Sequence, residues 1–536
     1  VRPIGIGETL RRVTGKALMR TVKEDVVKAC GGLQVCAGLE GGCEAAVHAM
    51  REIFSNETTE AALLVDASNA FNAVNRQAAL HNVSVLCPAM YPYLLNTYRA
   101  PARLFIPAWG EEIASNEGTT QGDPCAMAMY AVSVVPLIRN LSAGNPANLQ
   151  QVWFADDGTG AGELDTLRRW WDRIVNEGKP FGYYANATKT CLIVKPAFRE
   201  KARELFDGTG VKIRECLDPK QNGARHLGGA LGTDAFAAEY VRAKVEKLCE
   251  ELKTLAEFAN SEPQAAHTVF TRVFVAKWNY LQRVVPADPS LYQPLEEIIH
   301  HELLPRVTGQ KAISDLERKV LSLPARAGGI GVPSPTETSQ KNYHNSKEIT
   351  EGLTNKILRQ ETNFLPGEIK GWEKRKKELI QAKRASQERQ KENTLEQIRA
   401  THTHPSESTN PEKKKPPKPP DPPLIRALEM GSQKGASAWL TALPLQEYGW
   451  AVSKAEWHDA MCMRYGWRPA HLPKPHVLAA NKMIHNTRST APWEVIKLSA
   501  TTPCGTHLPT FSRKPGLKTF GPNTISPPCP QKCKEK

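Results

Sequence analysis

The chain has 536 residues, 40% of them hydrophobic, a proportion that supports buried cores and excludes a chain disordered throughout. Its formal net charge of +14 is unevenly divided, since residues 341–536 hold 33 basic and 18 acidic side chains and the rest holds 37 and 38. Because the first 340 residues are almost neutral, a uniformly basic protein that coats nucleic acid is excluded as well.

Apolar runs and helical patterns alternate through the first 340 residues and predict a globular region. Residues 61–65 and 152–155 predict buried strands, each followed directly by aspartate. Residues 126–138 follow the breaker Gly122-Asp123-Pro124 and predict a buried helix that is too short to cross a bilayer. Two further helices are predicted over residues 240–259 and 264–282.

The C-terminal third has a different composition. Residues 371–400 are rich in Lys, Arg, Glu and Gln, which predicts a solvated helix or linker with non-specific nucleic-acid contact as the less favoured alternative. Residues 413–423 predict a polyproline linker, and residues 439–467 a small ordered island rich in Trp and Tyr. The scattered cysteines favour reduced thiols in an intracellular protein, nuclear or cytoplasmic. Because the sequence begins at Val1 within a segment that already has an ordered pattern, we expect the chain to be a fragment of a longer protein.

Two aspartate sites close predicted strands. Asp66 ends LLVD, and Asp156 and Asp157 end VWFADD ahead of Gly158. Converging carboxylates on rigid strand ends are what Mg²⁺ requires, and two such ions support phosphoryl transfer. Taken alone, Asp-Asp-Gly is more often an ordinary hairpin turn.

The order of the motifs favours the catalytic interpretation. They are Asp66-Ala-Ser-Asn-Ala-Phe71, Gly118-Thr-Thr-Gln-Gly-Asp-Pro124, Phe154-Ala-Asp-Asp157, Gly182-Tyr-Tyr-Ala-Asn-Ala-Thr-Lys189 and His226-Leu-Gly-Gly-Ala-Leu-Gly232. In this order and spacing the sequence resembles the reverse transcriptases of retrotransposons, RNA-directed DNA polymerases, over most of residues 1–360. The segments Arg2-Pro3-Ile4, Trp278-Asn-Tyr-Leu-Gln-Arg283 and Leu323-Pro-Ala-Arg-Ala-Gly-Gly329 extend the resemblance.

The resemblance implies an α+β fold, a right-hand polymerase palm in which an antiparallel sheet with helices carries the aspartates. The implied divisions are partial fingers (1–55), palm (56–224), a primer-grip-like turn with a helical thumb (225–360), a charged and Pro-rich linker (361–423), a small retroelement-type segment (424–486) and a disordered end (487–536). The N-terminal truncation of the fingers follows from basic segments that relatives carry upstream. Relatives also run on into a Cys/His cluster, which this sequence does not match, so no zinc site is predicted.

The resemblance also implies roles for single residues. Asp66, Asp156 and Asp157 form the carboxylate triad, and the backbone carbonyl of Ala67 is a further metal ligand. Lys189 is implied as the proton donor to departing pyrophosphate, with a solvated lysine as the alternative.

Contacts with nucleotide, template and primer are implied for Arg2, Phe71, Gln121, Gly122 and the turn Leu227-Gly228-Gly229. An aromatic ring at Phe71 would collide with a 2′-hydroxyl, but a core aromatic is an equal alternative. The Gln121 segment serves equally as the start of a helix. Arg2 fits a triphosphate clamp or a solvated surface arginine, and the glycine turn fits a primer grip or an ordinary hairpin.

The predicted reaction is RNA-templated DNA synthesis with two Mg²⁺ ions, Mn²⁺ being possible, and deoxynucleoside triphosphates as substrates. RNA template and DNA primer are the predicted partners, with no membrane and no further cofactor. The alternative is a catalytically inactive retroelement remnant that at most binds nucleic acid.

Overall fold

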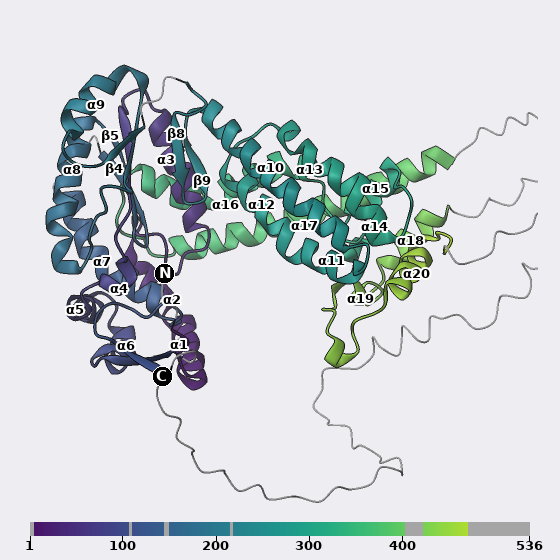
Figure 1. The fold of residues 1–536 in the computed structure, drawn as a ribbon, viewed down its shortest axis with the longest axis horizontal. Helices are drawn as coiled ribbons and strands as arrows, with labels where there is room; N and C mark the ends of the chain where they lie inside the picture. Colours follow the sequence, from purple (N-terminus) through teal and green to yellow (C-terminus); the bar gives the residue numbers. More distant parts are fainter. Residues whose placement is uncertain (1–4, 107–109, 144–148, 215–217, 403–421, 470–536) are drawn as a thin grey trace, which may run out of the picture. The chain divides into compact units, whose positions relative to one another are not determined.

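The computed structural model describes residues 5–106, 110–143, 149–214, 218–402 and 422–469 (Figure 1). The chain divides into two units, Val1–Pro473 and Lys474–Lys536, and all described residues belong to the first. Arg2, most of the Pro-rich stretch 413–423 and the predicted disordered end 487–536 lie outside the described residues.

A five-stranded sheet carries the strands that end in aspartate. Its order is β4-β5-β1-β6-β7, with β1 (Ala61–Val65), β4 (Leu149–Phe154), β5 (Asp157–Gly162), β6 (Cys191–Val194) and β7 (Lys212–Arg214). The neighbouring strands are antiparallel except β6 and β7, which are parallel. The strand predicted over 152–155 ends at Phe154, because Ala155 lies in the loop between β4 and β5.

Both faces of this sheet are covered, which explains why β1 is apolar throughout. Leu63 and Val65 belong to a core shared with α5 (Arg76–Leu86), α7 (Ala126–Ala143) and α8 (Leu164–Glu177). Ala62 belongs to a second core shared with α3 (Gly42–Ser55), on the other side of the strands from α8 in Figure 1. Alternate side chains of a strand point to opposite faces, so burial on both sides produces a continuous apolar run.

Helix α7 is longer than predicted. It runs to Ala143, and its 18 residues are long and apolar enough to cross a membrane, so the argument from length was wrong. However, 67% of this 18-residue segment is buried inside the protein, as in a core helix. Within the described ranges it is the single helix that meets the length and composition criteria.

Smaller elements surround the sheet. They are α1 (Thr9–Thr21), α2 (Lys23–Cys30), α4 (Ala70–Ala73), α6 (Tyr91–Tyr98), α9 (Arg199–Phe206) and the hairpins β2 (Ala102–Ile106) with β3 (Glu111–Ser115) and β8 (Gly223–His226) with β9 (Gly229–Gly232). Helix α1 packs against the start of α7, where Arg11 forms an ion pair of 2.8 Å with Asp123. Asp123 also accepts a hydrogen bond of 2.8 Å from the backbone of Cys125, in the turn that precedes the start of α7 at Ala126.

A helical region follows β9. It contains α10 (Asp234–Phe258), α11 (Pro263–Val269), α12 (Val275–Val284), α13 (Gln293–Ile298), α14 (Leu304–Thr308), α15 (Asp315–Ser322) and α16 (Pro335–Leu358). The first predicted helix starts earlier than expected, at Asp234, because the Thr233 side chain accepts a hydrogen bond from the backbone of Phe236 and caps it. The second is α11 and α12, joined by one π-helical segment at Phe270–Phe274.

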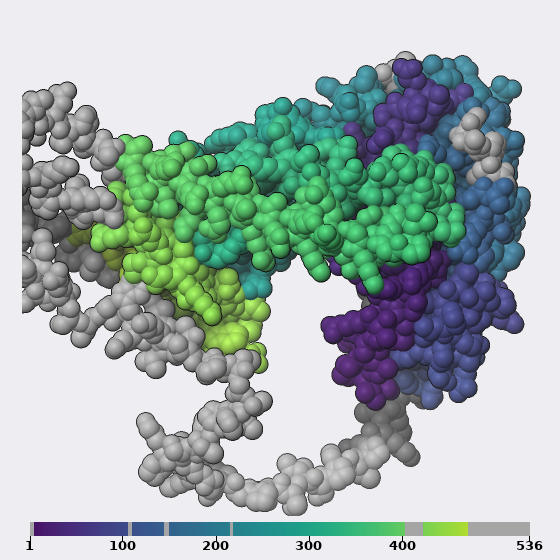
Figure 2. Space-filling model, turned by 180° about the vertical axis from the view of Figure 1, so that it is seen from behind, coloured from purple at the N-terminus to yellow at the C-terminus, as the bar shows by residue number. Residues whose placement is uncertain are grey.

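The predicted linker over 361–423 contains helix α17 (Glu368–His402), whose mostly exposed side chains confirm the solvated helix that was one of the two predictions for residues 371–400. Its Ile398 is fully buried in the core of the helical region, and Lys376 forms an ion pair with Glu40. Figure 2 shows α16 and α17 in green, lying along one face of the molecule. The few apolar residues of α17 are too widely spaced among its charges to form a recognisable apolar face in the sequence.

The Trp- and Tyr-rich segment packs into the same helical region, through α18 (Pro423–Gly431), α19 (Ala438–Thr441) and α20 (Lys454–Tyr465). The Trp457 indole donates a hydrogen bond of 3.0 Å to the Val307 carbonyl. Arg464 and Tyr465 donate hydrogen bonds of 3.0 and 3.1 Å to the Gly328 carbonyl. The described part of 424–486 is therefore an extension of this core and not a separate island.

Candidate active site

The loop that carries Asp156 contains only two residues. Phe154 pairs with Asp157 across the β4–β5 hairpin, so Ala155 and Asp156 alone make the turn. Ala155 has a φ of 56°, and two-residue hairpin loops require such a positive value at their first position. The tight turn fixes where the two aspartates leave the sheet.

Two buried side chains hold this loop by its backbone. The Gln34 amide donates to the Ala155 carbonyl and accepts from the Ala155 N–H, both at 3.0 Å. The Tyr183 hydroxyl donates to the Asp156 carbonyl at 2.8 Å. Neither residue was predicted as part of the site; a polar Gln34 between apolar neighbours in Leu33-Gln-Val35 is the signal that could have revealed it.

Asp66 follows β1 directly and is held on the other side by the segment before β6. Its carbonyl accepts a hydrogen bond of 2.7 Å from the backbone of Asn186, and its N–H donates to the buried Thr190 hydroxyl at 3.3 Å. Ala67 forms an antiparallel bridge with Ala185 in which the flanking residues supply the hydrogen bonds. The Ala67 carbonyl therefore points away from that segment, toward the β5 side of the strand.

The structure brings the three predicted carboxylates to one edge of the sheet. Val65 pairs with Gly158, so Asp66 and Asp157 occupy the next facing positions on adjacent strands. Facing residues of antiparallel strands have Cβ atoms about 4.5–5.5 Å apart. Burial, followed by the charges of Asp156, Asp157 and Asp66, holds the pKa of the Tyr183 hydroxyl well above its usual range. One hydroxyl thus lies within electrostatic reach of all three.

Lys189 lies beside this edge of the sheet. Its ammonium is 3.9 Å from the Asp66 carboxylate, and the two side chains are 61% and 38% exposed. Solvent screens an ion pair of this kind, so its contribution to stability is small. The lysine side chain is therefore mostly exposed to solvent.

Phe71 packs against a second aromatic residue, Tyr130. Its ring stacks on Tyr130 of α7 at a centroid distance of 4.5 Å. Burial, the charge of Tyr183 and that of Asp156 raise the pKa of the Tyr130 hydroxyl. Phe71 is half-buried, so it belongs partly to the core and partly to the surface near the aspartates.

The segment before α7 packs against α4, which follows Asp66. Thr119 donates a backbone hydrogen bond of 2.7 Å to Phe71. A Cβ on Gly118 would lie 2.4 Å from the Phe71 carbonyl oxygen, so only glycine allows this approach. Gln121 and Gly122 follow at the surface, half-buried and exposed respectively.

The predicted primer-grip-like turn is a two-residue hairpin with positive φ at Leu227 (46°) and Gly228 (80°). Both carbonyls are held by tyrosines of the helical region: Tyr280 donates to Leu227 at 2.6 Å and Tyr240 to Gly228 at 3.0 Å. The preceding His226 lies 3.0 Å from the Thr159 hydroxyl of β5. The turn is thereby connected to the strand that begins with Asp157.

The donor set fits a hard cation in chemistry, because it consists of carboxylates and one backbone carbonyl. Within the described ranges, no group of three or more His, Cys, Asp or Glu side chains is arranged to hold a metal ion. Binding a cation at Asp66, Asp156 and Asp157 would therefore require their side chains to turn toward one another. Asp157 is exposed and Asp66 partly so, which leaves room for that movement.

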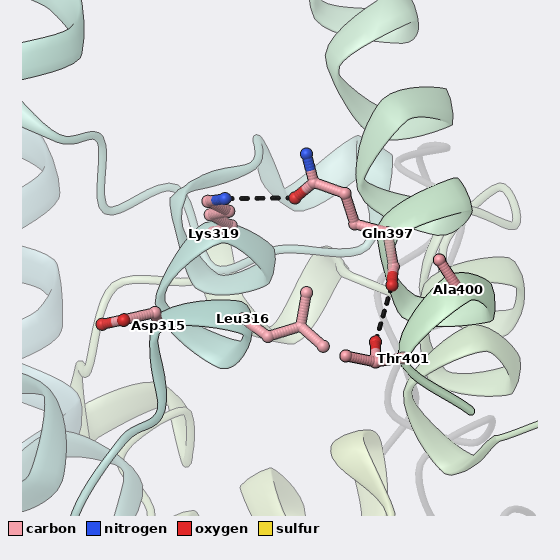
Figure 3. A pocket seen from close by; sticks show the side chains of 6 residues that line it. All are labelled: Asp315, Leu316, Lys319, Gln397, Ala400 and Thr401. Atoms are coloured by element: carbon pink, nitrogen blue, oxygen red, sulfur yellow. Dashed lines mark hydrogen bonds between the residues drawn. The ribbon is translucent and has the colours of Figure 1, made fainter. Parts of the chain in front are cut away.

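A cavity lies between α15 and α17, and the aspartates of this site do not line it (Figure 3). It has a volume of about 440 Å³, and Lys319 and Gln397 form a hydrogen bond of 3.1 Å beside it. It contains none of the predicted site residues.

No protein-family model and no curated protein matches the sequence. Among solved structures, the apo telomerase of Candida tropicalis is 9% identical, with 69% of this chain and 60% of that chain covered and a TM-score of 0.32. The telomerase of Candida albicans in complex with a TWJ fragment of telomeric RNA is 11% identical, with coverages of 67% and 59% and a TM-score of 0.31. The match thus spans less than two thirds of either telomerase, and a likeness at these TM-scores carries no argument about activity.

Proposed function

We propose that this chain is a nucleotidyltransferase of the reverse-transcriptase type, which extends a DNA primer along an RNA template. The observation that carries the proposal is the placement of Asp66, Asp156 and Asp157 at one edge of the sheet, on backbone held from both sides. In this proposal the sheet with its helices is the palm, the region after residue 225 is the helical thumb, and residues before 56 are partial fingers.

The three aspartates and the Ala67 carbonyl would hold two Mg²⁺ ions, which when bound lower the pKa of an attacking hydroxyl and stabilise charge on the phosphates. The hairpin loop fixes Asp156 and Asp157 relative to Asp66, so the carboxylates need little rearrangement of the backbone. Lys189 donates a proton to pyrophosphate as it leaves, since its ammonium already lies 3.9 Å from Asp66.

The remaining residues position the substrates. The primer 3′-hydroxyl attacks the α-phosphate of a deoxynucleoside triphosphate, forming a phosphodiester as the bond to pyrophosphate breaks. Phe71 restricts the space for a 2′-hydroxyl, and the Gln121-Gly122 segment contacts nucleotide and template. The Leu227-Gly228-Gly229 turn contacts the primer strand, where glycine allows close approach of the backbone.

Primer extension on an RNA template tests the proposal. Full-length wild type with Mg²⁺ and deoxynucleoside triphosphates should extend a labelled DNA primer, and Asp156→Ala with Asp157→Ala should abolish extension. The matched control replaces Asp165 and Asp172 of α8 with Ala, since these partly exposed acids form ion pairs away from the site. Wild type that binds the primed template but extends it no better than the double variant would support the inactive remnant instead.

A further inference from the structure

Strand β4, which leads into the aspartate loop, lies at the edge of the five-stranded sheet, and two distant segments cover its outer side. The Trp153 N–H donates to the Leu33 carbonyl at 2.7 Å, and the Trp153 carbonyl accepts from the Val35 N–H at 2.9 Å. Gln360 covers Gln151 in the same way: its side-chain amide accepts from the Gln151 N–H and donates to the Gln151 carbonyl, both at 3.0 Å. The backbone groups of an edge strand are thus paired without a further strand.

Gln360 lies in a short segment that follows α16, residues 359–364, which we call the connector. Its φ is 54°, a left-handed value that is costly for a residue with a side chain, so its surroundings hold it in place. The buried Lys356 fixes the connector. Its ammonium bonds to the Glu361 carboxylate at 2.8 Å and to the Asn363 carbonyl at 3.0 Å.

The connector also holds the segment that carries Gln34. The Gly32 N–H donates to the Thr362 carbonyl at 3.1 Å. A Cβ on Gly31 would collide with the same carbonyl oxygen, so the two backbones approach this closely only because glycine stands there. Gln34 in turn bonds to both backbone groups of Ala155. The connector therefore supports the aspartate loop by two routes, through β4 and through the Gln34 segment.

Helix α16 leads from the helical region to the connector (Figure 1). At its first residue, the Pro335 carbonyl accepts a hydrogen bond of 2.7 Å from Gln282 of α12. At its last residue, the Leu358 carbonyl accepts a hydrogen bond of 2.6 Å from Gln150 of β4. One helix thus joins the helical region to the edge strand, and the connector begins where this helix ends.

We propose that Gln360 is a positioning residue for the carboxylates of Asp156 and Asp157, acting through β4 and the Gln34 segment. This inference rests on the proposed function, because it assigns to the connector the alignment of that reaction's metal ligands. Gln360 acts at a distance: Gln151 and Asp156 are five residues apart, about 16 Å in an extended chain. Loss of the Gln360 amide leaves both backbone groups of Gln151 without these partners and frees β4 to shift at the edge of the sheet.

Hydrogen–deuterium exchange of the full-length protein, resolved to single residues and without substrates or metal, tests the inference. Gln360→Gly removes the amide and relieves the left-handed φ, so the variant should fold. The Gln151 N–H loses its acceptor and should exchange about 10-fold faster. The Ala155 N–H, whose acceptor is Gln34, should also exchange faster, because its support depends on the connector.

The matched control is Gln433→Gly, which removes an exposed glutamine from a turn and should leave both exchange rates unchanged. Faster exchange at Gln151 alone would overturn the inference, because Gln360 would then only cap the edge strand. Unchanged exchange at both residues in Gln360→Gly would overturn it as well.

The Mg²⁺ concentration that gives half the maximal rate of primer extension is the second readout. It should rise about 10-fold in Gln360→Gly, as when a residue that orients a metal ligand is lost, and stay at the wild-type value in Gln433→Gly. A smaller folded fraction would lower the rate but leave this concentration unchanged, so an unchanged concentration would overturn the inference. A wild type that extends no primer would refute the proposed function, whereas exchange at Ala155 would still decide whether Gln360 holds the aspartate loop.

Discussion

Gln34 and Ala155 exchange two hydrogen bonds of 3.0 Å, although 120 residues separate them in the chain. The amide of a fully buried glutamine thereby satisfies both backbone groups of a residue whose φ is 56°. A two-residue turn with alanine at this position is strained, and these hydrogen bonds offset part of the strain. The segment around Gln34 thus determines the geometry of the loop that presents Asp156.

Gln34→Ala should destabilise the protein, because it leaves two buried backbone groups without partners. The expected loss in the free energy of unfolding is about 1–3 kcal/mol for each orphaned group. Urea denaturation followed by tryptophan fluorescence measures it. Gln381→Ala, on the exposed surface of α17, should change stability little. Equal stability of the two variants would show that the Gln34 hydrogen bonds do not support the loop.

Much of the site's environment could be predicted from the sequence, and the residues that hold it could not. β1 and the β4–β5 hairpin follow from apolar runs that end in aspartate, because burial on both faces of a sheet leaves a local signal. For Gln34 the local signal is only a polar residue between apolar neighbours, and its pairing with Ala155 could not be predicted because it depends on how distant segments meet. Tyr183, Tyr240 and Tyr280 are similar, because each hydroxyl donates to a loop carbonyl on another element of the fold.

The C-terminal helices show a second reason why prediction from sequence fell short. Residues 371–400 were predicted to form a solvated helix or linker, and α17 is a helix with mostly exposed side chains, but its buried Ile398 lies in the core of the helical region. Its remaining apolar contacts depend on α15 and α16, which the local pattern does not reveal. Helices of this kind are stabilised by tertiary packing more than by their own periodicity.

Stability should fall as the pH is lowered from about 6.5 to 4, because burial lowers the pKa of His226 to about 4. The unfolded chain binds a proton near the ordinary histidine pKa of 6.5, and the folded chain does not until the pH approaches 4. The contribution of neutral His226 to folding stability is therefore complete above pH 6.5 and is lost progressively as the pH falls toward 4. His48 and His267, whose pKa values are also lowered by burial to about 4, act in the same direction.

His226→Gln should make this pH dependence shallower by about 1.4 kcal/mol per pH unit over that interval. Glutamine can still bond to the Thr159 hydroxyl, so the variant should fold at neutral pH. Urea denaturation at several pH values measures the slope. Identical slopes for wild type and variant would contradict the burial of a neutral His226.

Tyr280→Phe should destabilise the protein by about 1 kcal/mol, because it removes the hydrogen bond to the Leu227 carbonyl. It should also raise the KM for primer if the turn contacts that strand. Tyr292→Phe is the matched control, because the Tyr292 hydroxyl is buried without a hydrogen-bond partner among the described residues. Removal of the Tyr292 hydroxyl should leave the free energy of unfolding unchanged or raise it. The reverse order of the two variants would refute the role given to Tyr280.

Phe71→Ala should relax the choice between deoxyribonucleotides and ribonucleotides. Removing the ring opens space for a 2′-hydroxyl, and loss of a steric contact of this size lowers discrimination by about 10- to 100-fold. The ratio of kcat/KM for dATP and ATP on one primed template measures it. Phe198→Ala, a half-buried aromatic residue on another segment, should keep the ratio. An unchanged ratio in Phe71→Ala would leave this ring a core residue only.

The most direct test of the central claim is the rate of single-nucleotide addition to a DNA primer on an RNA template, compared between wild type and Asp66→Asn. Asparagine keeps the shape of the side chain and removes its charge. The account predicts that wild type adds the nucleotide in Mg²⁺ and that Asp66→Asn lowers the rate by about 10³-fold or more, with primer–template affinity unchanged. Equal rates in the two proteins, or no addition by wild type, would contradict it.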